Sequence, residues 1–402
     1  MTQVAILGFG VVGSGVADLI TKNSKEVFAL GGDEINVKYI LDLRDFPDPP
    51  FGDRVVHDFD VIISDSEVKY VIEVMGGSHP AYEYTLAALR AGKNVITSNK
   101  EVVANFGDEF LAAAEAAGVS YRFEAAVGGG IPVISPLISC VRQNKITEVR
   151  GILNGTTNYI LTKMFSFGDG FAESLADAQA RGSAERNPDA DILGTDASRK
   201  IAILASLVTG KLVPTSHIHT EGITAIRKTD VAAAARVGLA IKLLGRAVVT
   251  HGELEIMVAP FMLPEKSPLG GVSGVYNAVE VLGEPISSVM FYGPGAGAGP
   301  TASAVVGDLM QIMRSGTATA TPTMKKTTEG VKPFSDFVAR SYVALTGITE
   351  SDVRAALGEV EFIFADGECA FITEEMREAD VCAALESLTR AGATVLSRIR
   401  LL

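Results

Sequence analysis

Cysteine and histidine are scarce in this chain and are not spaced as metal ligands. Its 402 residues include three cysteines and five histidines. Cys140, Cys369 and Cys382 are far apart and form no C-x-x-C pair. This spacing provides no zinc site and is typical of reduced thiols in the cytoplasm.

Long apolar runs and an excess of positive charge are also missing, and we expect no leader segment. Charged residues or glycines interrupt each apolar stretch before it reaches membrane-spanning length. The N-terminus leads directly into an expected strand, so we expect no signal peptide. Lys and Arg total 35 against 48 Asp and Glu, a formal net charge of -13. An acidic surface argues against nucleic acid or an anionic membrane as the main partner. We therefore expect a cytoplasmic protein that binds neither.

A glycine-rich turn is the most informative feature that is present. Gln3 to Leu7 forms a short apolar run typical of a buried parallel strand, and Ser14 to Ile20 opens a helix. The turn between them matches G-x-G-x-x-G, which in this setting predicts dinucleotide binding, because a helix N-terminus attracts phosphate. The alternative is an ordinary strand–turn–helix corner. The candidate cofactor-binding residues are Gly8, Phe9, Gly10, Val11, Val12 and Gly13.

Strands and helices alternate up to about residue 130, which predicts a doubly wound, Rossmann-like parallel sheet over residues 1–130. Residues 55–64 fit neither pattern. The expected strands cover 3–7, 35–41, 68–75, 94–97 and 120–125, and the expected helices cover 14–20, 82–91 and 106–117.

Beyond residue 130 the pattern changes. We predict a mixed α/β catalytic domain over 131–294 and a helix at about 295–315 that returns to the first domain. A Thr-rich linker is expected over 316–335. Residues 336–402 follow the order strand, helix, strand, strand, helix, strand, which indicates a ferredoxin-like module. Within the middle domain we expect strands at 149–153, 247–250, 253–259 and 289–292 and helices at 171–181 and 197–208.

Several charged residues stand where ligands bind in such folds. Asp42 and Arg44 end the second strand, where an acid would bind the ribose 2′-hydroxyl of NAD and an arginine the 2′-phosphate of NADP. The residues leave this choice open. Lys100 follows a strand at the carboxyl edge of the sheet, where ligands bind. Glu124 ends another expected strand before Gly128 to Gly130, and backbone carbonyls there suit a hard cation, although a flexible interdomain turn is the alternative.

Asp196 and Lys200 lie four residues apart at the start of an apolar helix for which Thr195 or Asp196 is a natural N-cap. A surface pair of this kind is usually a solvated ion pair. A lysine at the start of a buried helix, beside an acid, is a candidate proton-transfer group. The catalytic and structural interpretations stay equally open on these residues alone.

The chain resembles the homoserine dehydrogenase family up to about residue 315. The resemblance implies NAD(P)-linked interconversion of L-homoserine and L-aspartate 4-semialdehyde, on the route to threonine, methionine and isoleucine. The motifs that carry it, in order, are residues 8–15, Glu73-Val74-Met75-Gly76-Gly77, Val95-Ile96-Thr97-Ser98-Asn99-Lys100, residues 124–132, Asn154-Gly155-Thr156-Thr157-Asn158-Tyr159-Ile160, residues 182–200 and residues 290–309.

The same resemblance implies roles for individual residues. Lys200 would be the proton donor and acceptor, and Lys100 would assist it and, with Ser98, line the cofactor site. The substrate's amino group would be held by Glu185 and Asp196, with Asp191 in the same segment as a further substrate-binding candidate. A sodium or potassium ion would rest on the backbone carbonyls of Glu124, Val127, Gly129 and Ile131.

The sequence departs from the family pattern in three places. Asn187 stands before Pro188 where the family usually has Asp, and Asp42-Leu43 before Arg44 suggests one inserted residue, which leaves both NAD and NADP possible. The tail resembles an ACT-type regulatory module but has Gly347 to Glu350 where a Pro-Gly turn is usual, so threonine inhibition is a hypothesis. A homodimer, through the middle domain, is the family expectation.

Two other functions are the alternatives. One is another amino-acid or semialdehyde dehydrogenase. A phosphorylating enzyme of that kind would need a catalytic cysteine, and Cys140 lies beyond the glycine turn in an expected helix. The other is a catalytically inactive nucleotide-sensing regulator of the same fold, which the joint presence of Lys100, Glu185, Asp196 and Lys200 argues against.

Overall fold

The computed structural model describes residues 1–25, 33–46, 51–141, 143–315, 323–364 and 368–402. Residues 316–322 of the expected linker lie outside this part of the chain. The first of its two compact units consists of Met1–Asn144, Ala202–Thr215 and Phe291–Thr327. The second consists of Lys145–Ile201, Ser216–Met290 and Thr328–Leu402.

A six-stranded parallel sheet forms the centre of the first unit. Its strand order, β3-β2-β1-β4-β5-β6, is that of a dinucleotide-binding fold. The predicted doubly wound sheet is therefore confirmed. The strands are β1 (Thr2–Leu7), β2 (Ile35–Leu41), β3 (Val55–Val56), β4 (Val68–Glu73), β5 (Asn94–Thr97) and β6 (Tyr121–Arg122), and the helices between them are α1 (Val11–Lys22), α3 (Phe59–Ser64), α4 (Ala81–Arg90) and α5 (Lys100–Ala117).

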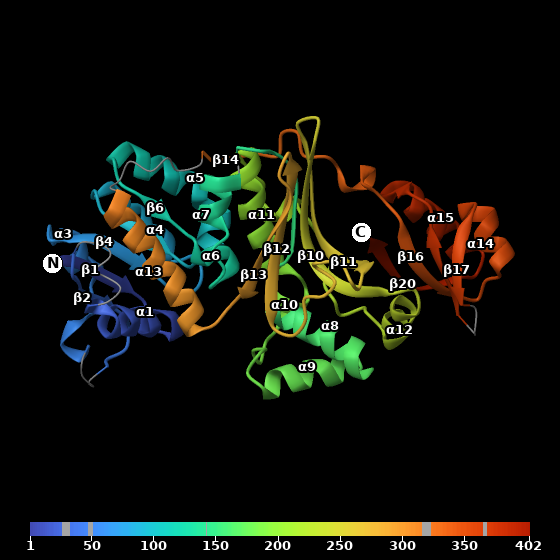
Figure 1. The fold of residues 1–402 in the computed structure, drawn as a ribbon, viewed down its shortest axis with the longest axis horizontal. Coiled ribbons are helices and arrows are strands. Elements are labelled where there is room, and N and C mark those ends of the chain that lie inside the picture. Colours follow the sequence, from blue (N-terminus) through green and yellow to red (C-terminus); the bar gives the residue numbers. More distant parts are fainter. Residues whose placement is uncertain (26–32, 47–50, 142, 316–322, 365–367) are drawn as a thin grey trace. The chain divides into compact units, whose positions relative to one another are not determined.

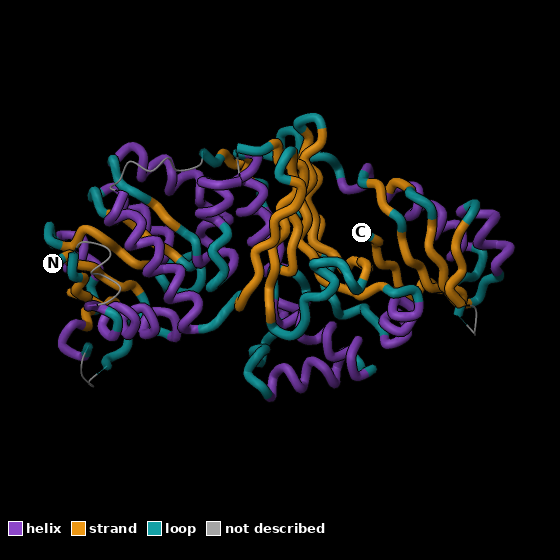
Figure 2. Tube along the Cα trace, viewed as in Figure 1, coloured by secondary structure: helices purple, strands orange, loops and turns teal. Residues whose placement is uncertain are grey.

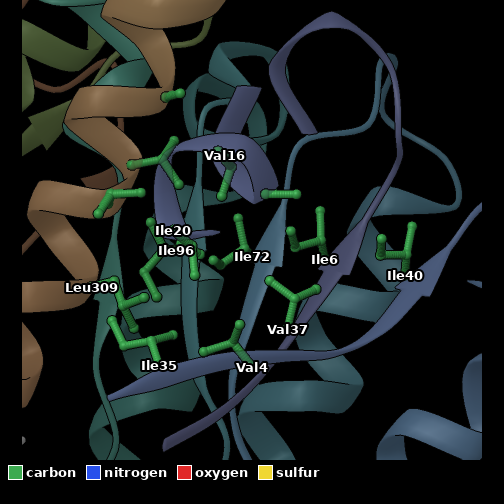
Figure 3. Close-up of a cluster of buried hydrophobic side chains, with 14 of the residues drawn as sticks. Val4, Ile6, Val16, Ile20, Ile35, Val37, Ile40, Ile72, Ile96 and Leu309 are labelled. Carbon is green, nitrogen blue, oxygen red and sulfur yellow. The ribbon is translucent and has the colours of Figure 1, made fainter. Parts of the chain in front are cut away.

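One late helix completes the core of this unit. Helix α13 (Ala298–Ser315) lies beside α1, with the backbone oxygen of Ala298 only 3.2 Å from where a Cβ on Gly15 would be (Figure 1). Leu309 of α13 joins Ile6 and Val16 in one buried apolar cluster (Figure 3). The glycine turn thus packs against a cluster whose residues are about 300 positions apart in the sequence.

The second unit is organised by a larger sheet, whose order is β13-β12-β7-β10-β11-β20-β16-β18-β17 (strands orange in Figure 2). Its first half contains β7 (Lys145–Ile152), β10 (Leu239–Thr250), β11 (Glu253–Pro264), β12 (Tyr276–Glu284) and β13 (Ser287–Pro294), with β9 (His219–Thr220) paired to β11. The helices of this unit before residue 300 are α8 (Gly155–Phe167), α9 (Phe171–Ala180), α10 (Asp189–Ile192), α11 (Thr195–Thr209, shared with the first unit) and α12 (Lys228–Arg236).

The C-terminal tail has the predicted order of elements. Its strands lie in the order β20-β16-β18-β17 with antiparallel neighbours, as in a ferredoxin-like fold. Its sheet is not separate, because β20 pairs in parallel with β11 through Phe261–Arg400 and Met262–Leu401. The elements are β16 (Ser341–Thr346), α14 (Glu350–Leu357), β17 (Val360–Phe364), β18 (Cys369–Thr373), α15 (Glu378–Arg390) and β20 (Thr394–Leu401).

The structure differs from the sequence prediction at some elements, either in their bounds or because they were not predicted. Helix α5 begins at Lys100 and not at residue 106, because the Asn99 side chain caps it by accepting hydrogen bonds from the backbone N–H groups of Glu101 and Val102. Strand β12 was missed because Glu280 interrupts its apolar pattern; this buried carboxylate accepts a hydrogen bond from Arg150 at 2.8 Å. Residues 59–64, which were ambiguous, form α3. Among the described helices, none is long and apolar enough to cross a membrane.

A buried carboxylate links the strand ends at the carboxyl edge of the first sheet. Glu73, the last residue of β4, is 0% exposed. It accepts hydrogen bonds from the Thr97 hydroxyl at 2.6 Å and from the backbone N–H of Met75 at 2.8 Å. Burial raises the pKa of Glu73 to about 7, against these hydrogen bonds.

Glu73 makes stability depend on pH. Its pKa is higher in the folded than in the unfolded chain, so the folded state holds an extra proton between about pH 4.5 and 7. We expect the free energy of unfolding to fall as pH rises through that window, by up to about 1.4 kcal/mol per pH unit from this group. Glu73→Gln should flatten this slope in urea unfolding at pH 5, 6, 7 and 8, while the exposed Glu115→Gln should not. An unchanged slope in Glu73→Gln would contradict the assignment.

Candidate active site

The glycine turn leaves room for a phosphate at the start of α1. A Cβ on Gly13 would lie 2.0 Å from the Gly8 carbonyl oxygen, so only glycine allows this close packing. Gly8 itself has a φ of 94°, which favours glycine. A Cβ on Gly10, the N-cap of α1, would meet no atom within 4 Å. The open side of the turn therefore lies where the unpaired N–H groups of the helix start can meet an anion.

Asp42 and Arg44 interact with each other at the end of β2. The Arg44 Nε and backbone N–H both donate to Asp42 Oδ1 at 3.0 Å. The Phe9 backbone N–H donates to Asp42 Oδ2 at 2.8 Å, so this carboxylate also fixes the glycine turn. The hydrogen bond from Arg44 lowers the pKa of Asp42 to about 2. Both residues directly follow β2 and lie beside the glycine turn, and their contact with the adenosine ribose stays a prediction.

Lys100 and Ser98 lie at the carboxyl edge, as the sequence predicted. Lys100 is the first residue of α5, and Ser98 donates its backbone N–H to the Glu73 carbonyl at 3.3 Å. Asn99 between them donates its amide to the Gly77 carbonyl at 2.8 Å. The Thr97 hydroxyl that donates to Glu73 accepts the Asn99 backbone N–H at 2.8 Å. Glu73 therefore supports the Ser98–Lys100 loop, a role that sequence reasoning missed.

Glu124 does not end a strand, contrary to the prediction from the sequence. Strand β6 ends at Arg122, and Glu124 precedes a short helix, α6 (Ala125–Gly128). Its carboxylate accepts backbone hydrogen bonds at 2.7 Å from Val133, Ile134 and Ser135. A cation at this turn would thus meet backbone oxygens, since the Glu124 side chain is already occupied. In the described residues, no three His, Cys, Asp or Glu side chains are grouped to hold a metal.

The glycines after Glu124 allow close packing. A Cβ on Gly129 would lie 2.4 Å from the Gly295 carbonyl oxygen, and one on Gly130 would lie 2.5 Å from Pro300. The segment that leads into α13 therefore packs directly against this turn. The Glu124 backbone N–H donates to Asp308 of α13 at 2.8 Å. Burial, followed by the charge of Glu124, raises the pKa of Asp308 to about 7.

Lys200 lies in a buried polar cluster of the second unit. Its ammonium donates to Asp196 Oδ2 at 2.8 Å and to the Leu153 carbonyl at 2.7 Å. The residues Asp196 and Lys200 are 3% and 6% exposed, which separates this pair from a solvated surface ion pair. Helix α11 begins at Thr195, so neither Thr195 nor Asp196 is its N-cap as the sequence suggested. Asp196 lies in the first turn of the helix.

Asn154 joins this cluster and was missed as a site residue. Its amide nitrogen donates to Asp191 at 2.7 Å and to Asp196 at 3.0 Å. Its amide oxygen accepts the Thr157 backbone N–H at 2.9 Å and so caps α8. The asparagine at the start of the Asn-Gly-Thr-Thr motif was the available signal. One amide thereby fixes two carboxylates and a helix start.

Glu185 lies outside the cluster of Asn154, Asp191, Asp196 and Lys200. It is exposed on the connection between α9 and α10, where its backbone carbonyl accepts a hydrogen bond from Gln179 at 3.1 Å. Lys200 and its partners belong to the second unit and Lys100 to the first.

Comparison with known proteins identifies the family. Residues 8–124 match the family model described as "Homoserine dehydrogenase, NAD binding domain", and residues 132–310 match the model described as "Homoserine dehydrogenase". Homoserine dehydrogenase of Synechocystis is 39% identical over 97% of this chain and 96% of its own length. The Bacillus subtilis enzyme is 40% identical over 78% of this chain and 73% of its own.

Solved structures agree. A homoserine dehydrogenase from Thiobacillus denitrificans superimposes with a TM-score of 0.90 at 32% identity, covering 100% of this chain and 98% of its own. A hyperthermophilic archaeal homoserine dehydrogenase mutant in complex with NADPH gives a TM-score of 0.65 at 28% identity, covering 77% of this chain and 97% of its own. The chain therefore belongs to the homoserine dehydrogenase family, has that family's NAD-binding domain and is an oxidoreductase that acts on a CH–OH group.

Proposed function

We propose that this enzyme interconverts L-homoserine and L-aspartate 4-semialdehyde, with Lys200 as the proton donor and acceptor. The buried contact between the Lys200 ammonium and Asp196 carries this proposal. Family membership supports this reading over another dehydrogenase activity or an inactive nucleotide sensor.

Lys200 is suited to the oxygen at which charge develops. The nicotinamide dinucleotide supplies or accepts the hydride when it is bound. In the reducing direction the carbonyl oxygen of the substrate becomes negative, and a nearby ammonium stabilises that charge and then gives up its proton. Asp196 and the Leu153 carbonyl fix the ammonium, so little reorientation is needed. Lys100 assists in this scheme.

Acidic residues of the same segment recognise the substrate's ammonium. A carboxylate forms charge-assisted hydrogen bonds with an amino-acid substrate. We assign this role to Asp191, Asp196 and the exposed Glu185. Asn154 acts through two of them, because it holds Asp191 and Asp196 in one arrangement.

A lysine variant tests the reaction directly. Lys200→Met should lower kcat for NAD(P)H formation from L-homoserine by roughly 10²–10⁴-fold, because the proton acceptor is lost. Dinucleotide affinity, measured by fluorescence titration, should stay unchanged. Lys228→Met, at a half-exposed lysine of α12, is the matched control. Near-full turnover in a folded Lys200→Met enzyme would refute the role of Lys200, and no turnover of homoserine by the unmodified enzyme would refute the function.

We propose that the end of β2 accepts both NAD and NADP. Asp42 presents a carboxylate that is ionised at neutral pH and suits a ribose 2′-hydroxyl. The Arg44 side chain is 62% exposed, so its guanidinium can also donate to a 2′-phosphate. The two cofactors would then use neighbouring side chains of one site.

This arrangement predicts opposite effects on the two cofactors. Arg44→Ala should raise the KM for NADP by about tenfold or more and change the KM for NAD little, because a charge-assisted contact is lost only with the phosphate. Asp42→Asn should weaken NAD relative to NADP, and its side-chain oxygen can still accept the Phe9 N–H. Steady-state kinetics with both dinucleotides measure the ratio. Parallel shifts for NAD and NADP would contradict the assignment.

Family membership adds three finer proposals. A sodium or potassium ion would bind the backbone oxygens of Glu124, Val127, Gly129 and Ile131. The Glu124 carboxylate already accepts three backbone hydrogen bonds, so these backbone oxygens would be the cation's ligands at this turn. The ferredoxin-like tail would be an ACT-type module that binds threonine, and the second unit would form a homodimer. Activity assays with varied Na⁺, K⁺ and threonine, and sedimentation velocity, test all three. An absence of ion dependence, of threonine inhibition or of dimer would remove the corresponding proposal.

A further inference from the structure

We infer that Arg400, in the last strand of the tail, is a positioning residue for the Lys200 cluster: it holds Glu221, whose segment lies against the turn that begins helix α11. The inference rests on the proposed role of Lys200. It links the tail to catalysis by direct contacts within the second unit and does not depend on the tail binding an effector.

Arg400 joins the tail to the catalytic part of the unit. Arg400 is 3% exposed, and its guanidinium donates to both Glu378 carboxylate oxygens, at 2.7 and 3.0 Å. The remaining nitrogen, Nη1, donates to Glu221 Oε2 at 2.9 Å. Glu378 begins α15 of the tail, and Glu221 follows β9 of the catalytic part. One buried guanidinium therefore bridges two carboxylates that are 157 residues apart in the sequence.

Glu221 is firmly held on its other side as well. His219 contacts its second carboxylate oxygen at 2.6 Å, and its backbone N–H donates to the Val258 carbonyl of β11 at 2.8 Å. Burial acts to raise the pKa of Glu221, but the hydrogen bonds from His219 and Arg400 outweigh it and lower the pKa to about 2. This carboxylate is therefore ionised throughout the working pH range, and Arg400 is its buried counter-charge.

The segment after Glu221 presses on the turn that begins α11. The Ile223 backbone N–H donates to the Ile192 carbonyl at 2.9 Å. A Cβ on Gly222 would lie 2.1 Å from that same oxygen, so the two backbones are in direct contact. A Cβ on Gly194 would lie 3.1 Å from the Glu221 carbonyl oxygen. A shift of Glu221 would therefore be transmitted to residues 192–194.

This turn connects two of the candidate substrate residues. Ile192 ends α10, which contains Asp191, and α11 begins directly after Gly194 and contains Asp196 and Lys200. Asn154 links Asp191 to Asp196 by its amide. The path from the tail to the ammonium is thus a continuous series of hydrogen bonds and backbone contacts. Loss of Arg400 would remove the shared partner of the buried Glu378 and of Glu221, whose side chain is 34% exposed, and this favours a displaced arrangement.

Arg398 provides a matched control in the same strand. It also donates to Glu378, at 2.7 Å, and its side chain is 15% exposed. Its recorded partners, Glu378, Ser341 and Cys382, are all in the tail. Arg398→Met therefore weakens the tail's own ion pairs and leaves the Arg400–Glu221 bridge in place. A difference between the two arginine variants isolates that bridge.

The experiment compares full-length Arg400→Met, Arg400→Lys, Glu221→Gln and Arg398→Met by steady-state kinetics with L-homoserine, with dinucleotide fluorescence titration as the second readout. We expect Arg400→Met to lower kcat/KM for homoserine by about tenfold. The dinucleotide affinity should stay within about twofold, because its site is in the other unit. Arg400→Lys should recover part of the activity, Glu221→Gln should resemble Arg400→Met, and Arg398→Met should stay near the unmodified enzyme.

Several outcomes would overturn the inference. Equal losses in Arg400→Met and Arg398→Met would show a general effect of tail stability. Unchanged homoserine kinetics in the Arg400 and Glu221 variants would show that the bridge does not act on the cluster. If Arg400→Met fails to fold, Arg400→Lys and Glu221→Gln decide by the same comparison. Failure of the proposed function is separate, because it would appear as no homoserine turnover in the unmodified enzyme.

Discussion

The buried ammonium of Lys200 is the constraint on which the second unit depends. A charge with so little exposure is tolerated only where its partners are in place, and here these include the Asp196 carboxylate and the Leu153 backbone carbonyl. The carboxylate is in turn held by Asn154, which also caps the following helix. Helix α11, the start of α8 and the end of β7 are therefore fixed together by one set of polar contacts.

Elsewhere in the chain, buried carboxylates likewise accept hydrogen bonds from groups on separate segments. Glu73 joins two strand ends in the first unit, Glu124 takes three backbone N–H groups, and Glu378 takes two arginines. Each satisfies backbone or side-chain donors at a point where regular hydrogen bonding stops. The interior of this protein thus uses charged groups as connectors between segments that are distant in sequence, while apolar clusters such as the one that contains Ile6 and Val16 supply hydrophobic stabilisation.

The sequence predicted what local patterns encode. Gly8, Gly10 and Gly13 located the turn because their spacing, between a strand and a helix, is typical of a dinucleotide-binding fold. The pairing of Asp196 with Lys200 followed from helical spacing. Asn154, Glu73 and Arg400 were not found, because each acts through partners that only the tertiary fold brings near. Strand β12 was missed for a related reason: its buried Glu280 looks like an exposed residue until Arg150 is placed beside it.

The pairing of β20 with β11 also sets the order in which the molecule can be completed during synthesis. Strand β11 ends at Pro264, whereas its partner β20 begins only at Thr394, so the ribosome makes β20 well after β11. Until then this part of β11 presents unpaired backbone groups, the kind of edge that invites association with other chains. The first unit has a milder form of the same delay, since α13 reaches its core from residues 298–315. Neither half of this protein can finish folding before most of the other has been made.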